Sequence, residues 1–193
     1  MRNGGGYVNK AIFLDRDGTI NIDTGYVYKI EDFRFIDGVI QGLKYFQDEG
    51  FLLIVITNQS GIARGYYTEE DYHFLNSYMY SELEKYGIHI TKDYYCPHLP
   101  DAIVSRYSCI CNCRKPGTEL FYKAVNEFNI DLSQSYCIGD RLRDLSVCDN
   151  SDCRGFLIGQ SENEYIIEDV KSSKYRNITY CNTFTEVVAY TKD

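Results

Sequence analysis

Short apolar runs alternate with longer amphipathic segments along most of this chain. Continuous runs predict buried strands at residues 12–14, 51–56 and 135–139, and shorter strands are predicted at 92–95, 154–158 and 177–181. Apolar residues at helical spacing predict helices over 38–49, 68–83, 118–128 and 183–191. This alternation is typical of an α/β fold with a doubly wound, mainly parallel sheet and right-handed crossovers.

Local signals mark two of the helix ends and the extent of the domain. Thr68 followed by Asp71 is typical of a capping box that opens the second helix, and Gly50 stops the first. The 193 residues contain no internal repeat or linker, so residues 1–193 are predicted to form a single domain. Three glycines at positions 4–6 predict a loose amino terminus over residues 1–9.

Two aspartates one residue apart, Asp15 and Asp17, follow the first predicted strand. Open α/β sheets place their chemistry just beyond the carboxyl ends of the strands. Two carboxylates there can hold a divalent cation and divide the roles of nucleophile and acid–base between them. Asp-Gly is also an ordinary turn signal, but a turn accounts only for Gly18. We therefore interpret the acidic pair as functional.

Polar residues near the ends of later elements supply partners for this pair. Thr57 follows the second predicted strand, and Lys115 precedes the third predicted helix. Asp140 and Asp144 follow the strand at 135–139. An acid pair, a hydroxyl, a lysine and a second acid pair, in this order, resemble the four motifs of the haloacid dehalogenase-like (HAD) phosphatases.

The resemblance implies a phosphatase in which Asp15 is the nucleophile and forms an aspartyl-phosphate. Asp17 would be the general acid–base, and Thr57 and Lys115 would bind the transferred phosphoryl oxygens. The Mg²⁺ ligands implied by the family are Asp15, the backbone carbonyl of Asp17, and Asp140. Asp144 would support these ligands without binding the ion directly.

The spacing leaves no room for the cap domain that many HAD phosphatases insert after the first or second motif. Only about twenty residues separate Thr19 from the helix at 38–49, too few for an independent domain. Between the second motif and Lys115 lie one helix, one strand and a cysteine-rich loop. We therefore expect an open active site that is covered only by loops.

Cysteine and histidine residues crowd the loop at 96–113. The candidate ligands are Cys96, His98, Cys109, Cys111 and Cys113. Three sulfurs and one imidazole form a closed tetrahedral set that suits structural Zn²⁺, and spacing alone does not choose among the last three cysteines. HAD relatives with this loop use the Cys-x-Cys directly before Arg-Lys-Pro. The resemblance therefore selects Cys111 and Cys113, together with Cys96 and His98, and leaves Cys109 as an extra residue.

Further segments resemble one branch of the superfamily, the D-glycero-D-manno-heptose-1,7-bisphosphate 7-phosphatases. The matching segments are residues 23–27, 35–38, 57–65 and 94–98. The resemblance implies removal of the 7-phosphate, which would give heptose 1-phosphate for nucleotide-activated heptose. The implied substrate contacts are Asp23, Thr24, Gly25, Tyr26, Thr57, Asn58, Gln59, Ser60, Arg114, Lys115 and Arg141. The preference between the two anomers stays open.

Two alternatives remain beside this interpretation. Histidinol-phosphate phosphatase is a sister activity that shares the metal loop, but its members lack the Gly-Tyr-Val segment found here at 25–27. A catalytically idle phosphosugar-binding protein would require a lost catalytic group, and all four motifs are intact.

Composition restricts the partners. A formal net charge of −8 and the lack of Lys/Arg-rich runs argue against nucleic acid and anionic membranes. Apolar runs of about six residues are far shorter than the roughly 20 that a membrane span needs. Nothing indicates export, and in that setting clustered cysteines bind metal more often than they form disulfides. We expect a cytoplasmic monomer that acts on a small phosphorylated sugar.

Overall fold

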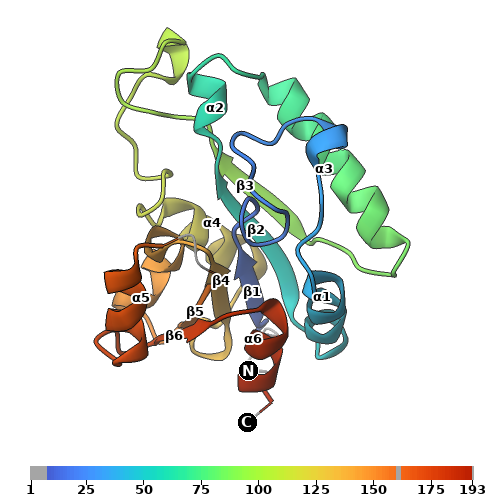
Figure 1. The fold of residues 1–193 in the computed structure, drawn as a ribbon, viewed down its shortest axis with the longest axis vertical. Coiled ribbons are helices and arrows are strands. Elements are labelled where there is room, and N and C mark those ends of the chain that lie inside the picture. The colour runs from blue at the N-terminus through green and yellow to red at the C-terminus, as the bar shows by residue number, and fades with distance from the viewer. Residues whose placement is uncertain (1–7, 160–161, 193) are drawn as a thin grey trace, which may run out of the picture.

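The computed structural model describes residues 8–159 and 162–192, whose six strands form one parallel sheet (Figure 1). The strands are β1 (Ala11–Leu14), β2 (Leu52–Asn58), β3 (Lys92–Cys96), β4 (Tyr136–Gly139), β5 (Arg154–Ile158) and β6 (Ile178–Cys181). They lie in the order β3-β2-β1-β4-β5-β6, and every neighbouring pair is parallel. The strand that carries the first acidic pair therefore lies inside the sheet, between β2 and β4.

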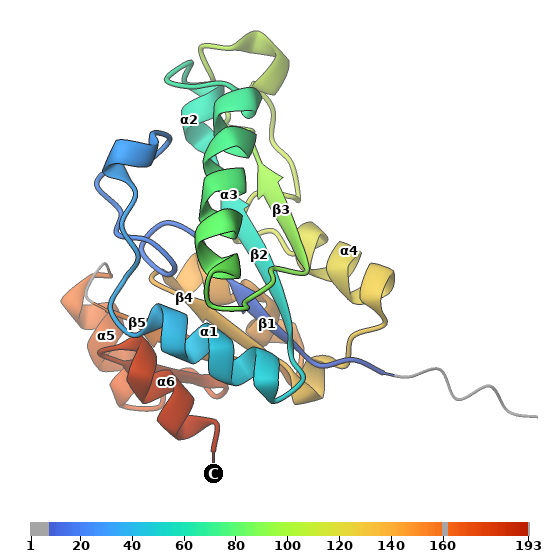
Figure 2. The ribbon, with the colours of Figure 1, turned by 90° about the vertical axis from the view of Figure 1, so that its right-hand side faces the viewer.

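Helices cover both faces of this sheet (Figures 1 and 2). They are α1 (Val39–Asp48), α2 (Ser60–Ala63), α3 (Glu69–Glu84), α4 (Glu119–Phe128), α5 (Glu164–Lys171) and α6 (Phe184–Tyr190). Ile12 and Leu14 of β1 pack in one core cluster with α1, α3 and α6. Ala11 and Phe13, which point the other way, pack in a second cluster with α4 and α5. Burial on both faces explains why the strands are continuous apolar runs.

Short 3-10 helices complete the described elements. They are η1 (Ile30–Asp32), η2 (Ser105–Tyr107), η3 (Leu132–Gln134) and η4 (Leu142–Asn150). The last of them begins directly after β4 and carries Asp144 back against the sheet, where this carboxylate is 2% exposed.

All ten predicted strands and helices are confirmed, and their ends agree to within two residues. The capping box is confirmed as well: Thr68 Oγ1 accepts from Asp71 N at 3.1 Å, and the Asp71 carboxylate accepts from Thr68 N at 2.8 Å. Two helices were not predicted. α2 is only four residues long, too short to show a period, and α5 lies in the region beyond Gly159 where the family resemblance fades.

The described residues between the strands hold no inserted domain. The segment from β1 to α1 contains only η1, and the segment from β2 to β3 contains α2 and α3. Of the loose amino terminus expected over 1–9, residues 1–7 lie outside the described residues. Asn9 is part of the folded body, because its amide donates to the Asn129 carbonyl at 2.9 Å. Among the described helices, none has the length and apolar character needed to cross a membrane.

Candidate active site

Carboxylates from two neighbouring strands meet around one lysine. Asp15 follows β1, and Asp140 and Asp144 follow β4; one oxygen of each lies within 4.8 Å of the others. Lys115 Nζ lies 2.8 Å from Asp15 Oδ1, 2.8 Å from Asp144 Oδ1 and 2.7 Å from the carbonyl of Ile56. The parallel pairing of β1 and β4 brings these side chains together at the same edge of the sheet.

Burial and charge compete in this cluster. Burial raises the pKa of Asp15 to about 6, although the nearby charge of Lys115 opposes the shift. Burial by itself would lower the pKa of Lys115, but the charges of Asp144 and Asp15 outweigh it and raise that pKa. Lys115 is therefore a permanent cation. Three carboxylates facing one lysine leave excess negative charge, which favours a further cation.

The donor set at this edge suits Mg²⁺, which prefers oxygen ligands and few carboxylates. The backbone leaves room for the Asp140 carboxylate at Gly18, whose φ of +85° belongs to the left-handed region. A Cβ atom at Gly18 would lie 2.4 Å from Oδ2 of Asp140. Only glycine lets that carboxylate approach the loop that carries Asp15 and Asp17.

Asp17 is held by a buried arginine. Arg16 is completely buried, and its Nη2 and Nε atoms lie 2.9–3.1 Å from the two oxygens of Asp17. Asn21 Nδ2 donates to the same carboxylate at 3.0 Å, and the Gln59 amide donates to it at 2.9 Å. Arg16 is anchored in turn by the Val27 carbonyl at 2.8 Å. These donors define one orientation of Asp17 beside Asp15.

The residues at the end of β2 and directly after it line the site and connect it to Lys115. Thr57 is buried at the end of the strand and accepts a hydrogen bond from Gln59 at 2.9 Å. Asn58 lies beside the Lys115 backbone: its amide donates to the Lys115 carbonyl and accepts from the Lys115 amide, both at 3.0 Å. Asn58 thus joins β2 to the segment that carries the lysine. Ser60 begins α2 at the edge of the site.

A cavity of about 340 Å³ opens above these groups. Of the residues named in the sequence analysis, it is lined by Asp15, Asp17, Asp23, Gly25, Tyr26, Thr57, Asn58, Gln59, Ser60, Arg114, Asp140, Arg141 and Asp144. Thr24 does not line it, and Lys115 lies beneath the carboxylates and is 3% exposed. The structure therefore gathers most of the predicted residues and leaves Thr24 outside.

Sequence reasoning missed three further lining residues, Arg64, Tyr67 and Arg143. Arg64 and Arg143 lower the pKa of Arg114, after burial, because their positive charges lie close to it. The Nε atom of Arg64 is buried and has no hydrogen-bond partner among the described residues. Arg64 belongs to a segment already matched to the family, at 57–65, but nothing in its spacing indicated that it turns toward the site.

The cysteine and histidine residues of the loop form a compact cluster. The Cys113 sulfur lies 3.1 Å from those of Cys96 and Cys111, and 3.3 Å from His98 Nδ1. Cys96 lies 3.6 Å from Cys111 and 3.8 Å from His98 Nδ1. A tetrahedral zinc site with Zn–S bonds of about 2.3 Å has sulfur–sulfur edges of roughly 3.8 Å. The sulfur atoms here lie somewhat closer together than that, and all four ligand atoms lie within 4.8 Å of one another, near enough for a single ion to contact them, whereas Cys109 is exposed and outside the cluster.

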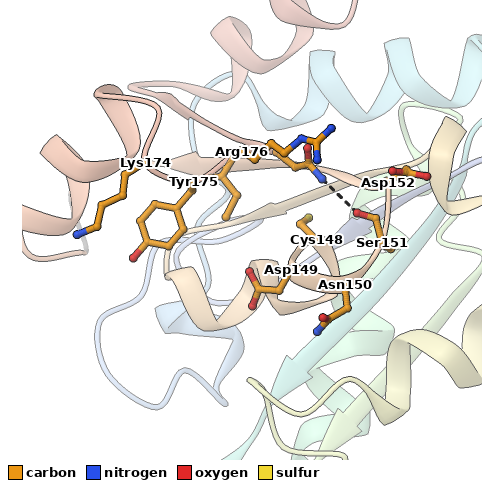
Figure 3. Close-up of a pocket in the computed structure, with 10 residues that line it drawn as sticks. Cys148, Asp149, Asn150, Ser151, Asp152, Lys174, Tyr175 and Arg176 are labelled. Carbon is orange, nitrogen blue, oxygen red and sulfur yellow. Dashed lines mark hydrogen bonds between the residues drawn. The ribbon is translucent and has the colours of Figure 1, made fainter.

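A second hollow, of about 490 Å³, shares no lining residue with the first (Figure 3). Its walls are the end of η4, the turn before β5 and the segment before β6, where Asn177 donates to the carbonyl of Ser151 at 3.1 Å. Half of the lining residues are exposed, and none is a predicted site residue. Although larger, it is therefore not the candidate active site.

Comparisons with known proteins identify relatives of this chain. The HAD-hydrolase-like family model matches residues 112–187. A D-glycero-β-D-manno-heptose-1,7-bisphosphate 7-phosphatase of Haemophilus ducreyi is 52% identical over 137 residues, 70% of this chain and 75% of that protein. The corresponding α-anomer phosphatase of Campylobacter jejuni is 47% identical over 79% of this chain and 84% of its own.

A solved structure shares the whole fold. It is D,D-heptose 1,7-bisphosphate phosphatase from B. bronchiseptica, complexed with magnesium and phosphate. It superimposes with a TM-score of 0.78 at 25% identity and covers 95% of this chain and 98% of its own. Together with the relatives above, this likeness shows that the chain belongs to the heptose-1,7-bisphosphate 7-phosphatase family of HAD-like hydrolases.

Proposed function

We propose that this protein is a Mg²⁺-dependent phosphatase that removes the 7-phosphate of D-glycero-D-manno-heptose 1,7-bisphosphate. The observation that carries the proposal is the buried group of Asp15, Lys115 and Asp140 at the floor of an arginine-rimmed cavity. Family membership supports the choice of substrate, since relatives named for both anomers are 47% identical or more. The product, heptose 1-phosphate, would serve the synthesis of nucleotide-activated heptose.

The chemistry proceeds in two displacements. A carboxylate oxygen of Asp15 attacks phosphorus, the bond from phosphorus to the sugar oxygen breaks, and that oxygen takes a proton from Asp17. Asp17 then removes a proton from water, whose oxygen attacks the aspartyl-phosphate and releases inorganic phosphate and free Asp15. Thr57 and Lys115 hold the phosphoryl oxygens by a hydroxyl donor and a fixed positive charge.

Asp15, Asp140 and the backbone carbonyl of Asp17 would hold the magnesium ion, as the donor chemistry of this edge suggests. When bound, the ion supplies neutralisation of the charge that develops on the phosphoryl oxygens. Lys115 pairs with Asp144 as well as with Asp15, so the lysine does not by itself neutralise the charge of Asp15.

The second metal would be a structural zinc ion held by Cys96, His98, Cys111 and Cys113. The cluster lies directly before Arg114, whose guanidinium donates to the carbonyl of His98 at 3.3 Å. A closed tetrahedral site would brace the loop at 96–113 and hold this arginine at the cavity rim. We assign the zinc ion no chemical step.

The positive charges at the rim of the cavity favour a substrate with a second phosphate group. The chain is acidic overall, yet Arg64, Arg114, Arg141 and Arg143 all line this one cavity. A guanidinium binds a phosphate dianion by paired hydrogen bonds, so these side chains suit the distal 1-phosphate. Asp23 offers an acceptor to sugar hydroxyls, and Gly25 lets the backbone approach the ring. The proposed enzyme is a single-domain cytoplasmic monomer.

A substrate panel tests the proposal. Both anomers of the heptose bisphosphate are compared with histidinol phosphate and a chromogenic aryl phosphate, with and without Mg²⁺. We expect the bisphosphate to have the highest kcat/KM and every activity to require Mg²⁺. Better turnover of histidinol phosphate would favour the sister activity, and binding without hydrolysis would favour an idle binding protein.

The variant Arg114→Ala sharpens this test. It should lower kcat/KM on the bisphosphate by roughly tenfold to a hundredfold, because a charge-assisted contact to the second phosphate is lost, and change aryl phosphate turnover little. Arg106→Ala is the matched control: Arg106 lies in the same loop but over the ring of Tyr107, outside the cavity. Equal losses on both substrates in Arg114→Ala would contradict the role of an anchor.

A further inference from the structure

Gln59 lies just beyond β2, is 1% exposed, and forms hydrogen bonds at both ends of its amide. Its Oε1 accepts from the Tyr67 hydroxyl at 2.5 Å and from Arg16 Nη2 at 3.4 Å. Its Nε2 donates to Asp17 Oδ2 at 2.9 Å and to Thr57 Oγ1 at 2.9 Å. A single amide therefore contacts both the acid–base and the hydroxyl of the proposed mechanism.

The chemistry of the partners fixes the direction of these bonds. A guanidinium has only donors, so the amide atom that faces Arg16 is the oxygen. The Asp17 oxygen that faces the amide already accepts from Arg16, so the amide atom beside it is the nitrogen. The hydroxyl oxygen of Thr57 consequently accepts from Gln59 and keeps its own proton to donate into the cavity, where the transferred phosphoryl group would lie.

Tyr67 is rigidly placed at the start of this chain of bonds. Its ring stacks on Tyr28, with centroids 5.2 Å apart and planes inclined by 13°. It also packs against Gly61 of α2, where a Cβ atom would lie 2.1 Å from the ring. Burial raises the pKa of the Tyr67 hydroxyl, which therefore remains a donor at physiological pH.

We propose that Gln59 and Tyr67 are positioning residues, which act as a hydrogen-bond relay from the Tyr67 hydroxyl through the Gln59 amide to Thr57 and Asp17. The relay directs the Thr57 proton toward the phosphoryl oxygens and holds the acid–base beside Asp15. Successive hydrogen bonds polarise one another, so a donor that also accepts becomes a stronger donor. The inference rests on the proposed phosphatase chemistry but not on which phosphate ester is the substrate.

A double-mutant cycle with Tyr67→Phe and Gln59→Met tests the relay, with a chromogenic aryl phosphate as the probe. Tyr67→Phe should lower kcat about fivefold, the effect of one hydrogen bond, with KM unchanged within about twofold. Gln59→Met should lower kcat by about tenfold to a hundredfold. In the Gln59→Met background the further change Tyr67→Phe should have almost no effect on kcat, since the relay is already broken.

A purely structural role predicts the opposite outcome. The fivefold loss would then recur in both backgrounds, and this additivity, or an unchanged kcat in Tyr67→Phe, would overturn the inference. Thermal midpoints of all variants check that each one is folded. Tyr107→Phe is the matched control: it removes a buried hydroxyl that donates to Glu69, outside the cavity, and should leave kcat unchanged.

Two further variants, Gln59→Glu and Gly61→Ala, test the relay independently of the double-mutant cycle. Gln59→Glu keeps the shape of the side chain but replaces the donor by a carboxylate beside Asp17, so it should lower kcat more than Gln59→Met. A role limited to filling space predicts the reverse order. Gly61→Ala should displace the Tyr67 ring and reproduce the kcat loss of Tyr67→Phe, although it removes no hydrogen-bonding group.

The wild-type protein separates this inference from the proposed substrate. Hydrolysis of the aryl phosphate without preference for the heptose bisphosphate would refute the substrate and leave the cycle interpretable. A clear preference for the bisphosphate combined with an additive cycle would refute only the relay. A wild-type protein without any phosphatase activity would refute both.

Discussion

The carboxylates around Lys115 and the thiols around His98 are both clusters of metal-ligating side chains, assembled by different means. Asp15 and Asp140 follow neighbouring strands, whose pairing determines how far apart their side chains lie. In the second cluster only Cys96 belongs to a strand, and the other three ligands come from the loop that follows β3. One cluster is therefore built by the sheet, and the other depends on a loop.

The two clusters also differ in what balances their charge. The protein itself supplies a cation to the first, because Lys115 contacts two of the three carboxylates at 2.8 Å. The second cluster contains thiol sulfur atoms 3.1–3.6 Å apart. A bound metal would favour loss of the thiol protons and would hold the resulting thiolates together. We therefore expect changes at the sheet edge to abolish chemistry in a folded protein, and changes in the loop to destabilise the loop first.

The largest expected effect is that of Asp15→Asn. The amide matches the shape of the carboxylate but cannot attack phosphorus, so kcat should fall by at least about 10⁴-fold. The thermal midpoint of the metal-free protein should change little, because Asp144 still pairs with Lys115. Steady-state kinetics and thermal unfolding in chelator check the two statements. Retained turnover would contradict the covalent mechanism, and an unfolded variant would contradict the idea that the sheet builds this cluster.

Asp17→Asn should have the next largest effect and a different pattern. Loss of the general acid–base should lower kcat by about 10²–10⁴-fold. Unlike Asp15→Asn, this variant should also lower the thermal midpoint, because Arg16 is completely buried and loses its only charged partner among the described residues. Measuring kcat and the thermal midpoint of both variants side by side distinguishes the roles of the two aspartates. A midpoint equal to that of the wild type would show that Arg16 does not depend on the carboxylate.

The contrast between the clusters also explains what could be predicted from the sequence. Continuous apolar runs located β1 and β4, and the ends of parallel strands meet at one edge of an open sheet, but the assignment of Asp140 to the same metal site as Asp15 came from the family resemblance. The residue types predicted a zinc site in the loop at 96–113, but the choice of Cys111 over Cys109 rested on the resemblance, because spacing did not distinguish between these two cysteines. The relay through Gln59 depends on a side-chain orientation, and α2 is shorter than any period. Such features arise only from tertiary packing.

Cys113→Ser should lower activity less than the aspartate variants, because it first destabilises the loop at 96–113. We expect zinc to be lost, the thermal midpoint to fall, and kcat/KM on the heptose bisphosphate to fall by roughly tenfold as Arg114 loses its support. Cys109→Ser is the matched control, since Cys109 is an exposed cysteine of the same loop outside the cluster, and it should keep both zinc and activity. Elemental analysis showing zinc lost from Cys109→Ser but kept in Cys111→Ser would reverse the choice of ligands.

A second support of the same loop lies on α3, at Glu69. Its carboxylate accepts hydrogen bonds from the hydroxyls of Tyr107, in η2 of the loop, and Tyr95, in β3. The hydrogen bond from Tyr107 contributes most to lowering the pKa of Glu69 below its usual 4.5, followed by that from Tyr95. Glu69 thus fastens the loop to a helix independently of any metal.

The smallest effect is therefore expected for Glu69→Gln, and it should depend on pH. A carboxyl whose pKa is lowered by folding stabilises the folded state above its usual pKa, and this contribution disappears as the pH falls through the folded value. The thermal midpoint of Glu69→Gln should accordingly lie slightly below that of the wild type at pH 7, and the difference should shrink as the pH falls below 4.5, the usual pKa of the carboxyl. Glu70→Gln is the matched control, because Glu70 is exposed and makes no such contact among the described residues. A difference that is the same at both pH values would mean that the two tyrosines bind the side chain without regard to its charge.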